Sequence, residues 1–208
     1  MLKISNLLIT RDSLKFHYDL NIEVGSALLI SGPSGQGKST LLDAIAGYVE
    51  IDAGNIQWGN LAIDTLPPAD RPVSYLFQEH NLFDHLTIMQ NLSIAIGHLP
   101  LIDRTAALEA LDIAEQADKF PGQLSGGQRL RASIIAATLR PEPILLLDEP
   151  FRELDPVTRK KTLNWCMQTV LRLNKTLVVV SHNTEDSLQL KDQFPVLQEY
   201  RINQGNSC

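Results

Sequence analysis

Short apolar runs, separated by polar and glycine-containing turns, predict several β-strands along the chain. Leu20, Ile22 and Val24 alternate with polar residues, which is the period-2 pattern of a half-buried strand. Other runs are almost entirely apolar, as expected of strands covered on both faces of a parallel sheet. The predicted strands are 2–10, 15–24, 27–31, 73–77, 144–147 and 176–180, with a small antiparallel sheet over 51–63 and edge strands within 196–202.

From residue 79 to about residue 123 the strand patterns disappear and apolar residues recur at helical spacing. Ala106, Leu108, Leu111 and Ala114 fall near one face of a helix predicted over 104–117. Further helices are predicted over 41–47 and 86–96, from the 124–128 segment to about 139, and over 159–173. We therefore expect one α/β domain over 1–208. It combines a parallel-sheet core, an N-terminal antiparallel β subdomain and a helical insertion over approximately 79–123.

Composition narrows the class of protein. The chain has 208 residues, of which 44% are hydrophobic and 20% charged, values typical of one globular domain. Its net charge of -6 does not suggest a nucleic-acid surface, so we expect no nucleic-acid partner. The N-terminus lacks a signal-peptide pattern and no uncharged apolar run reaches membrane-spanning length. We expect neither secretion nor membrane insertion, and reduced thiols at Cys166 and Cys208.

One glycine-rich stretch lies between a predicted strand and a predicted helix and fits G-x-x-x-x-G-K-[ST], the phosphate-binding P-loop. It consists of Gly32, Pro33, Ser34, Gly35, Gln36, Gly37, Lys38, Ser39 and Thr40. The glycines let backbone N–H groups close on phosphate oxygens, and the helix N-terminus adds its positive dipole end. Lys38 would reach the β- and γ-phosphates and Ser39 would bind Mg²⁺. The core is therefore expected to be a RecA-like P-loop NTPase.

Polar residues follow several of the predicted parallel strands. Gln78, Asp148, Glu149 and His182 each come just after such a strand. Because ligands of open α/β sheets bind beyond the carboxyl ends of the strands, we expect these side chains near the P-loop. Asp148 would help hold Mg²⁺, and Glu149, which has no obvious ion-pair partner in the sequence, would polarise a water for attack on the γ-phosphorus. Gln78 would touch the metal or this water, and His182 would hydrogen-bond the γ-phosphate.

A second glycine motif begins at residue 124. Ser125 occupies an N-cap position, and Gly126 and Gly127 leave the N–H groups of the following helix open to a phosphate. Taken alone, the motif is equally explained as a capped helix with a glycine-rich start. Beside a P-loop and an acidic strand end, it predicts a second anion site in the same chain.

Residues 124–128 match the signature motif of ATP-binding-cassette (ABC) ATPases, and essentially the whole chain resembles that family. The P-loop, a Q-loop at Gln78, a Walker B strand over 144–149, a D-loop around Asp155 and an H-loop at His182 occur in the family's order. In such proteins each ATP lies between the P-loop of one subunit and the signature helix of the other. The resemblance therefore implies a homodimer that binds ATP and Mg²⁺ and hydrolyses ATP. The residues that it adds to the nucleotide site are Ser125, Gly126, Gly127, Gln128 and Asp155.

The chain departs from the family pattern in two places. Many members carry an aromatic residue for the adenine base where this chain has Arg11, whose guanidinium plane offers an alternative stacking surface. Phe16 and Tyr18 lie nearby but are expected to fill the core, so the adenine contact is left open. The D-loop carries the bulky Arg152 and Glu153 where small residues usually precede Leu-Asp, which bears on the dimer seam.

The segment 71–87 resembles the corresponding stretch of bacterial importer ATPases, those for thiamine first and then those for iron and polyamines. The resemblance implies a peripheral subunit on the cytoplasmic side of the bacterial inner membrane, with transmembrane permease subunits and a periplasmic solute-binding protein as partners. Phe83 is expected to dock a permease helix, whereas Leu82 either docks it or packs the core of the insertion. An exporter ATPase and a soluble ABC ATPase outside transport are the alternatives.

Overall fold

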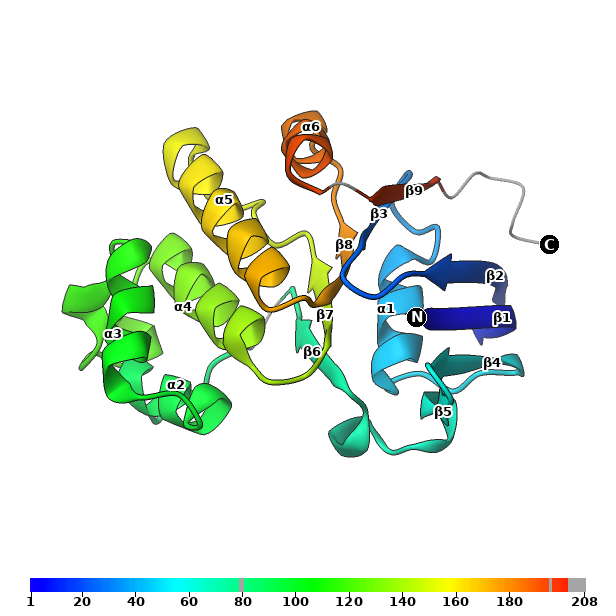
Figure 1. Ribbon diagram of the computed structural model, residues 1–208, viewed down its shortest axis with the longest axis horizontal. Coiled ribbons are helices and arrows are strands. Elements are labelled where there is room, and N and C mark those ends of the chain that lie inside the picture. The colour runs from blue at the N-terminus through cyan, green and yellow to red at the C-terminus, as the bar shows by residue number, and fades with distance from the viewer. Residues whose placement is uncertain (79–80, 195, 202–208) are drawn as a thin grey trace.

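The computed structural model describes residues 1–78, 81–194 and 196–201, with the side chain of Thr184 left aside. Two sheets form the framework, and Figure 1 shows helix α1 (Lys38–Ala46) between them. Strands far apart in the sequence lie side by side in the parallel sheet, whose order is β6-β7-β8-β3-β9. Its strands are β3 (Ala27–Ser31), β6 (Val73–Leu76), β7 (Ile144–Asp148), β8 (Thr176–Val180) and β9 (Leu197–Arg201). The predicted core strands are confirmed, and the 196–201 part of the predicted edge region forms one strand beside β3.

The second sheet is antiparallel, with the order β2-β1-β4-β5. Its strands are β1 (Leu2–Arg11), β2 (Leu14–Ile22), β4 (Ala53–Trp58) and β5 (Leu61–Ala62). A shift in register interrupts β1, where Asn6 adopts a φ of 47°, as a β-bulge does. The prediction that β2 extends to Val24 is wrong. Ser26 donates from its backbone to the carbonyl of Glu23, so the chain turns there and leaves Val24 49% exposed.

Alternate residues of the central strands face two separate cores, because successive side chains of a strand point to opposite faces. On one face, α1 and the antiparallel sheet cover Leu28, Ile30, Ile144, Leu146, Val178 and Val180. On the other face, helices α4, α5 and α6 cover Ala27, Leu29, Leu145, Leu147, Leu177 and Val179. These helices span Gly126–Leu139, Pro156–Arg172 and Thr184–Gln193. The sheet is thus buried on both sides, as its continuous apolar strands predict.

The chain between β6 and β7 is helical, and Figure 1 shows its helices at the end of the molecule away from the antiparallel sheet. It holds α2 (Ile88–Ile96) and α3 (Leu101–Ala110), which share a third core with α4. The predicted helix over 104–117 is wrong at both ends. It begins three residues earlier, after Pro100, and stops because Asp112 adopts a φ of 54°, which a right-handed helix cannot contain. Short 3₁₀ turns occupy Ile63–Thr65, Pro68–Asp70, Ala114–Gln116 and Pro121–Gln123.

Arg71 is a buried residue whose role the sequence does not reveal, because it sits in a proline-rich loop. Its guanidinium donates to the carbonyls of Ala44 and Ile45 at 2.7 and 2.9 Å and also to those of Leu66 and Asp64. The first two carbonyls belong to the last turn of α1, where few backbone donors remain, although the N–H of Gly47 also donates to the carbonyl of Ala44. Arg71 therefore ties the rear of α1 to the segment that leads into β6.

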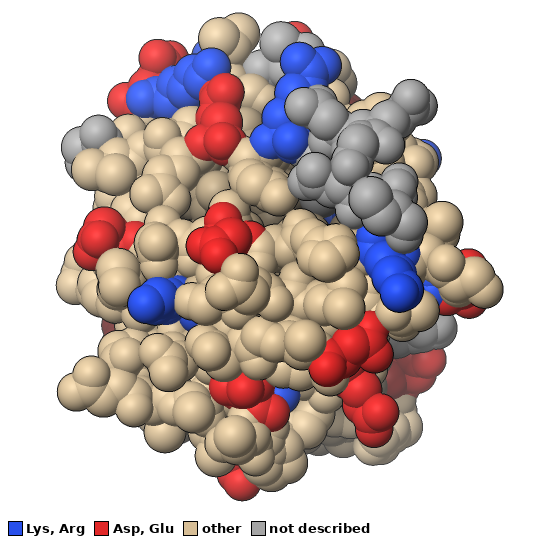
Figure 2. Space-filling view, turned by 90° about the vertical axis from the view of Figure 1, so that its right-hand side faces the viewer, with Lys and Arg blue, Asp and Glu red and all other residues tan. Residues whose placement is uncertain are grey.

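Among the residues that the structure describes, the face of the molecule formed by the antiparallel sheet has no region of a single charge. Figure 2 shows lysine, arginine, aspartate and glutamate side chains intermixed there, with broad uncharged areas between them. Within the described residues, every helix is too short or too polar to cross a lipid bilayer. Cys166 is buried and carries a free thiol, and Cys208 lies outside the described residues.

Candidate functional site

The P-loop joins β3 to α1 and wraps around the amine of Lys38. Gly37 precedes the helix with a φ of 86°, a conformation that favours glycine. The Lys38 ammonium donates to the carbonyls of Gly32 and Pro33 at 2.9 and 2.7 Å. Burial lowers the pKa of Lys38, and the carboxylates of Glu149 and Asp148 act in the opposite direction. The loop thus holds a positive charge inside a ring of backbone groups, which suits a phosphate.

The antiparallel sheet supports this loop from behind. Tyr18 donates its hydroxyl to the Gly37 carbonyl at 2.8 Å and is almost fully buried. A Cβ atom at Gly37 would lie 2.4 Å from the Tyr18 oxygen and 2.5 Å from a ring carbon of Phe16. The expectation that Phe16 and Tyr18 fill the core is therefore confirmed, and together they require glycine at position 37.

Asp148 ends β7 beside the start of α1. The Ser39 hydroxyl donates to its carboxylate, which lowers the pKa of Asp148, whereas burial has the larger effect and raises it. Hydroxyl and carboxylate oxygens are hard ligands of the kind that Mg²⁺ prefers, and a divalent cation would offset the burial of this charge. Ser39 and Asp148 therefore fit a shared magnesium site at the end of the P-loop.

Glu149 follows directly and has two partners, which corrects the expectation that it lacks an ion pair. One carboxylate oxygen lies 3.0 Å from His182 Nε2 and the other 3.0 Å from Arg152 Nη1. The backbone of Glu149 has a φ of 46°, a left-handed conformation that costs a non-glycine residue about 1–2 kcal/mol. Its N–H donates to the carbonyl of Val180 at 3.1 Å, so the neighbouring strand β8 holds this turn.

These groups open onto a cavity of about 350 Å³ at the carboxyl end of the parallel sheet. Its lining consists of Ser34, Glu149, Arg152, Ser181, His182 and Asn183. A P-loop residue thus faces the acidic turn after β7 and the histidine after β8. The sheet brings together most of the polar residues that the sequence places at its strand ends.

Gln78 occupies a different position. It lines a second cavity, of about 380 Å³, with Gly126 and Arg129 at the start of α4 and Glu153 of the D-loop. No described contact joins Gln78 to Asp148 or Glu149. In this structure Gln78 therefore faces the cavity at the start of α4 and not the Ser39–Asp148 site.

The signature segment forms a complete helix cap. The Ser125 hydroxyl accepts from the N–H of Gln128 at 3.3 Å, and the Gln128 side chain accepts from the N–H of Ser125 at 3.0 Å. Asp155 caps α5 in the same way, because its carboxylate accepts from the N–H groups of Val157 and Thr158. A hydrogen bond from the Thr158 side chain, together with these N–H bonds, lowers the pKa of Asp155. Both residues thus have a structural role within the subunit, beside any contact with a nucleotide.

Arg11, the residue that could stack on the adenine base, forms an ion pair in this structure. Its guanidinium lies 2.9 Å from a carboxylate oxygen of Asp43 on α1. The other oxygen of Asp43 accepts from the hydroxyl of Tyr75 at 3.1 Å. Arg11 is half-exposed, so its planar face stays available at the edge of the P-loop helix.

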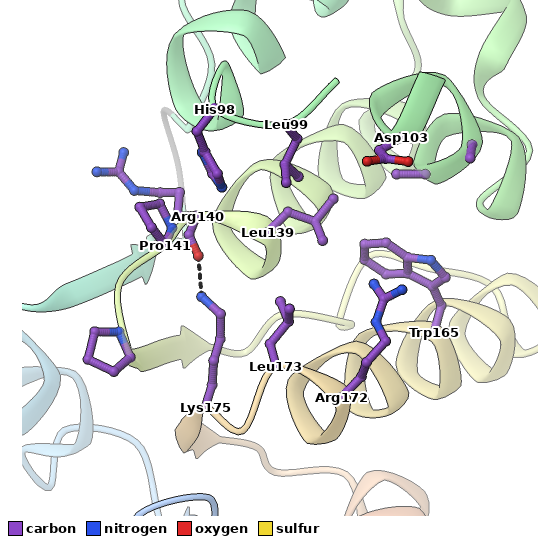
Figure 3. A pocket seen from close by; sticks show the side chains of 13 residues that line it. His98, Leu99, Asp103, Leu139, Arg140, Pro141, Trp165, Arg172, Leu173 and Lys175 are labelled. Carbon is purple, nitrogen blue, oxygen red and sulfur yellow. Dashed lines mark hydrogen bonds between the residues drawn. The ribbon is translucent and has the colours of Figure 1, made fainter. Parts of the chain in front are cut away.

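The opposite edge of the parallel sheet carries a larger cavity, of about 610 Å³, between the helical segment and the core. Figure 3 shows His98, Leu99 and Asp103 on one wall and Trp165 and Arg172 of α5 on the other. It lies at the starts of β7 and β8, remote from the strand ends that carry the chemistry above.

Lys175 closes this cavity from below and holds the end of α4. Its ammonium donates to the carbonyl of Arg140, drawn as a dashed line in Figure 3, and to that of Glu142 at 2.8 Å. Burial lowers the pKa of Lys175 to about 8 from its ordinary 10.5. Keeping the Lys175 ammonium charged in the folded protein therefore costs free energy, and this cost depends on pH.

The free energy of unfolding should rise between pH 8 and pH 10. In this window the unfolded chain still binds the Lys175 proton while the folded protein has released it, so deprotonation favours the folded state. The gain should be about 1–2 kcal/mol, since the two carbonyl hydrogen bonds already stabilise the ammonium in part. Urea unfolding of the parent protein and of Lys175→Met across this range measures it. An equal rise in both proteins would contradict the assignment to Lys175.

Comparisons with known proteins agree on one family. The family described as "ABC transporter" matches residues 16–152. The chain is 41% identical to the thiamine import ATP-binding protein ThiQ of Yersinia pseudotuberculosis, over 97% of this chain and 88% of that protein. It is 38% identical to ThiQ of Escherichia coli K12, over 97% and 90%. The dimeric post-hydrolysis structure of the ATP-binding cassette MJ0796 with ADP and Pi superposes with a TM-score of 0.79 at 27% identity, covering 98% of this chain and 97% of that one.

Proposed function

The chain belongs to the ABC transporter family, and from this premise we propose that it is the ATP-hydrolysing subunit of a bacterial importer. The proposal rests above all on one observation. The P-loop lysine, the Ser39–Asp148 contact and the Glu149–His182 pair lie at one edge of one sheet. We further propose that residues 1–208 form a single cassette whose helical subdomain covers approximately 79–123.

The chemistry follows from the placement of these side chains. The P-loop N–H groups and Lys38 would hold the phosphates, and Ser39 and Asp148 would hold Mg²⁺. Mg²⁺, when bound, neutralises charge on the phosphate oxygens. A water oxygen forms a bond to the γ-phosphorus while the bond to the β–γ bridging oxygen breaks, and Glu149 accepts the water proton. His182 would orient Glu149 and the γ-phosphate, and ADP and phosphate leave.

The active form would be a head-to-tail homodimer. In the monomer, Ser125 and the glycines after it cap α4 and have no described contact with Lys38. A second subunit would bring its own segment 125–128 and Asp155 against the nucleotide, so that two pockets form at the seam. Gln78, which lies beside the start of α4, would reach the metal or the attacking water when the helical segment moves.

The solute and the remaining partners follow from the relatives. The two relatives described above carry names that specify thiamine import, and we propose thiamine as the solute. The protein would then be peripheral, on the cytoplasmic side of the bacterial inner membrane. It would work with transmembrane permease subunits and a periplasmic thiamine-binding protein.

The segment 79–86 would form the docking site for the permease, and its first two residues, 79 and 80, lie outside the described part of the chain. Asn91 is buried and fixes this segment. Its side chain accepts from the N–H of Phe83 at 2.7 Å and donates to the carbonyls of Phe83, Leu86 and Thr87. Leu82 packs into the core of the helical segment, whereas Phe83 is 54% exposed. Phe83 is therefore the apolar side chain that this segment presents to a partner.

Phe83→Asp should abolish thiamine uptake in cells while the isolated protein keeps its ATPase rate. A buried charge at the permease interface costs several kcal/mol, which would reduce coupling at least tenfold. Radiolabelled thiamine uptake, co-purification with the permease and ATPase assays provide the measurements. Ile102→Asp is the matched control, because Ile102 is an apolar residue of the same helical segment and is 74% exposed. Normal uptake by the Phe83 variant would reject the docking site, and binding of no permease by the parent would reject the importer.

A further inference from the structure

The D-loop of this chain places an arginine directly on the glutamate of the catalytic turn. Arg152 Nη1 lies 3.0 Å from one carboxylate oxygen of Glu149, while His182 Nε2 lies 3.0 Å from the other. Each oxygen of Glu149 therefore already has a nitrogen partner within the subunit. The left-handed backbone at Glu149 and the N–H bond of Arg152 to the Glu149 carbonyl keep the two side chains on the same tight turn.

A glutamate that activates water must turn an oxygen toward that water. The Arg152 contact holds one oxygen of Glu149 toward the D-loop of its own subunit instead. Arg152 also lines the same cavity as Ser34 of the P-loop and His182, so a phosphate arriving there would compete with Glu149 for the guanidinium. Arg152 can thus pair with either of two anions, the Glu149 carboxylate of its own subunit or a phosphate of the bound nucleotide.

We propose that Arg152 is a positioning residue that restrains Glu149 in the resting subunit and releases it when the triphosphate and the second subunit close the pocket. The inference rests on the proposed ATPase function and extends it, because it assigns a regulatory contact to a D-loop residue. Arg152 is 69% exposed, and an exposed ion pair is weak. The restraint is therefore readily released, and its removal changes the rate by about threefold to fivefold rather than a hundredfold.

The test compares ATP hydrolysis by the full chain and by Arg152→Ser at saturating ATP and at several protein concentrations. At protein concentrations that do not saturate the dimer, Arg152→Ser raises kcat about threefold to fivefold with KM changed less than twofold, because the contact affects the position of Glu149 and not ATP binding. Arg152→Lys keeps the positive charge and stays within twofold of the parent. Raising the salt from about 0.05 M to 0.5 M accelerates the parent but not Arg152→Ser, since salt screens an exposed pair.

Two controls separate this restraint from other effects. Lys161→Ser removes another exposed cation, paired with Asp112 away from the site, and leaves the rate unchanged. The double variant Glu149→Gln with Arg152→Ser stays inactive, because the acceleration acts through Glu149. An Arg152→Ser rate equal to or below the parent rate overturns the restraint while leaving the ATPase function intact. So does a gain that is as large at protein concentrations that saturate the dimer as at low ones, because the closed dimer has already released Glu149. Absence of hydrolysis in every variant and in the parent overturns both proposals.

Discussion

Glu149→Gln is expected to reduce ATP turnover by about two to four orders of magnitude while leaving nucleotide binding intact. The amide keeps the size of the carboxylate and can still bond to His182, but it cannot accept a proton from water. The hydrogen bonds of Lys38 and the Ser39–Asp148 contact do not include Glu149, so the triphosphate should still bind. The variant should also accumulate as an ATP-bound dimer, because the step that ends that state is blocked.

Three measurements on one preparation decide this prediction. Phosphate release gives turnover, a fluorescent nucleotide gives affinity, and size-exclusion chromatography with and without ATP gives the oligomeric state. Glu109→Gln on α3 is the matched control, because it removes an exposed carboxylate away from the site. If Glu149→Gln hydrolyses ATP at the parent rate, Glu149 is not the group that accepts the proton.

Lys38→Ala and Ser125→Asp should each be nearly inactive alone and should restore activity to each other when mixed. Asp is as good an N-cap as Ser, so Ser125→Asp keeps α4 folded but sets a negative charge against the partner's phosphates. In a head-to-tail dimer, one of the two pockets of a mixed pair combines an intact P-loop with an intact signature segment. Random pairing makes half of the dimers mixed, so about a quarter of all pockets should be intact.

The mixture is assayed at equal amounts and at high protein concentration, beside each variant alone. Ser125→Asn is the control for the helix cap, because Asn caps as well as Ser and carries no charge. A mixture no more active than the average of its two components would contradict shared pockets. Full activity of Ser125→Asp alone would do the same.

The sequence alone predicts those parts of the fold that are determined by residues close together in the chain. The P-loop, the apolar strands and the cap at Ser125 are encoded by neighbouring residues, and the structure has all three where the sequence places them. Helix α6 is missed because its residues are mostly polar, and of its two buried residues among those described, Asp186 and Leu190, only the second is apolar. The end of α3 is missed because the left-handed conformation of Asp112 leaves no clear mark in the apolar spacing.

The contacts of the site depend on tertiary placement and are harder to predict. The pairing of Glu149 with Arg152 requires the φ of 46° at Glu149, which strand β8 supports through the Val180 carbonyl. Arg71 reaches the end of α1 only because the loop before β6 passes behind that helix. Gln78 faces the start of α4, a neighbour that follows it by some fifty residues in sequence. Such contacts have no signature in a single sequence.

Trp165 lies at the joint between the helical segment and the sheet core, because it packs against the hydrophobic clusters of both. The chain has two tryptophans, and the other, Trp58, packs against the core beneath the antiparallel sheet. A Trp58→Phe protein would therefore carry one tryptophan, sited where the two halves of the subunit meet and excited selectively over tyrosine at long wavelength. Any rotation of one half against the other would change the surroundings of that indole ring, and its emission would report the movement in real time without a label.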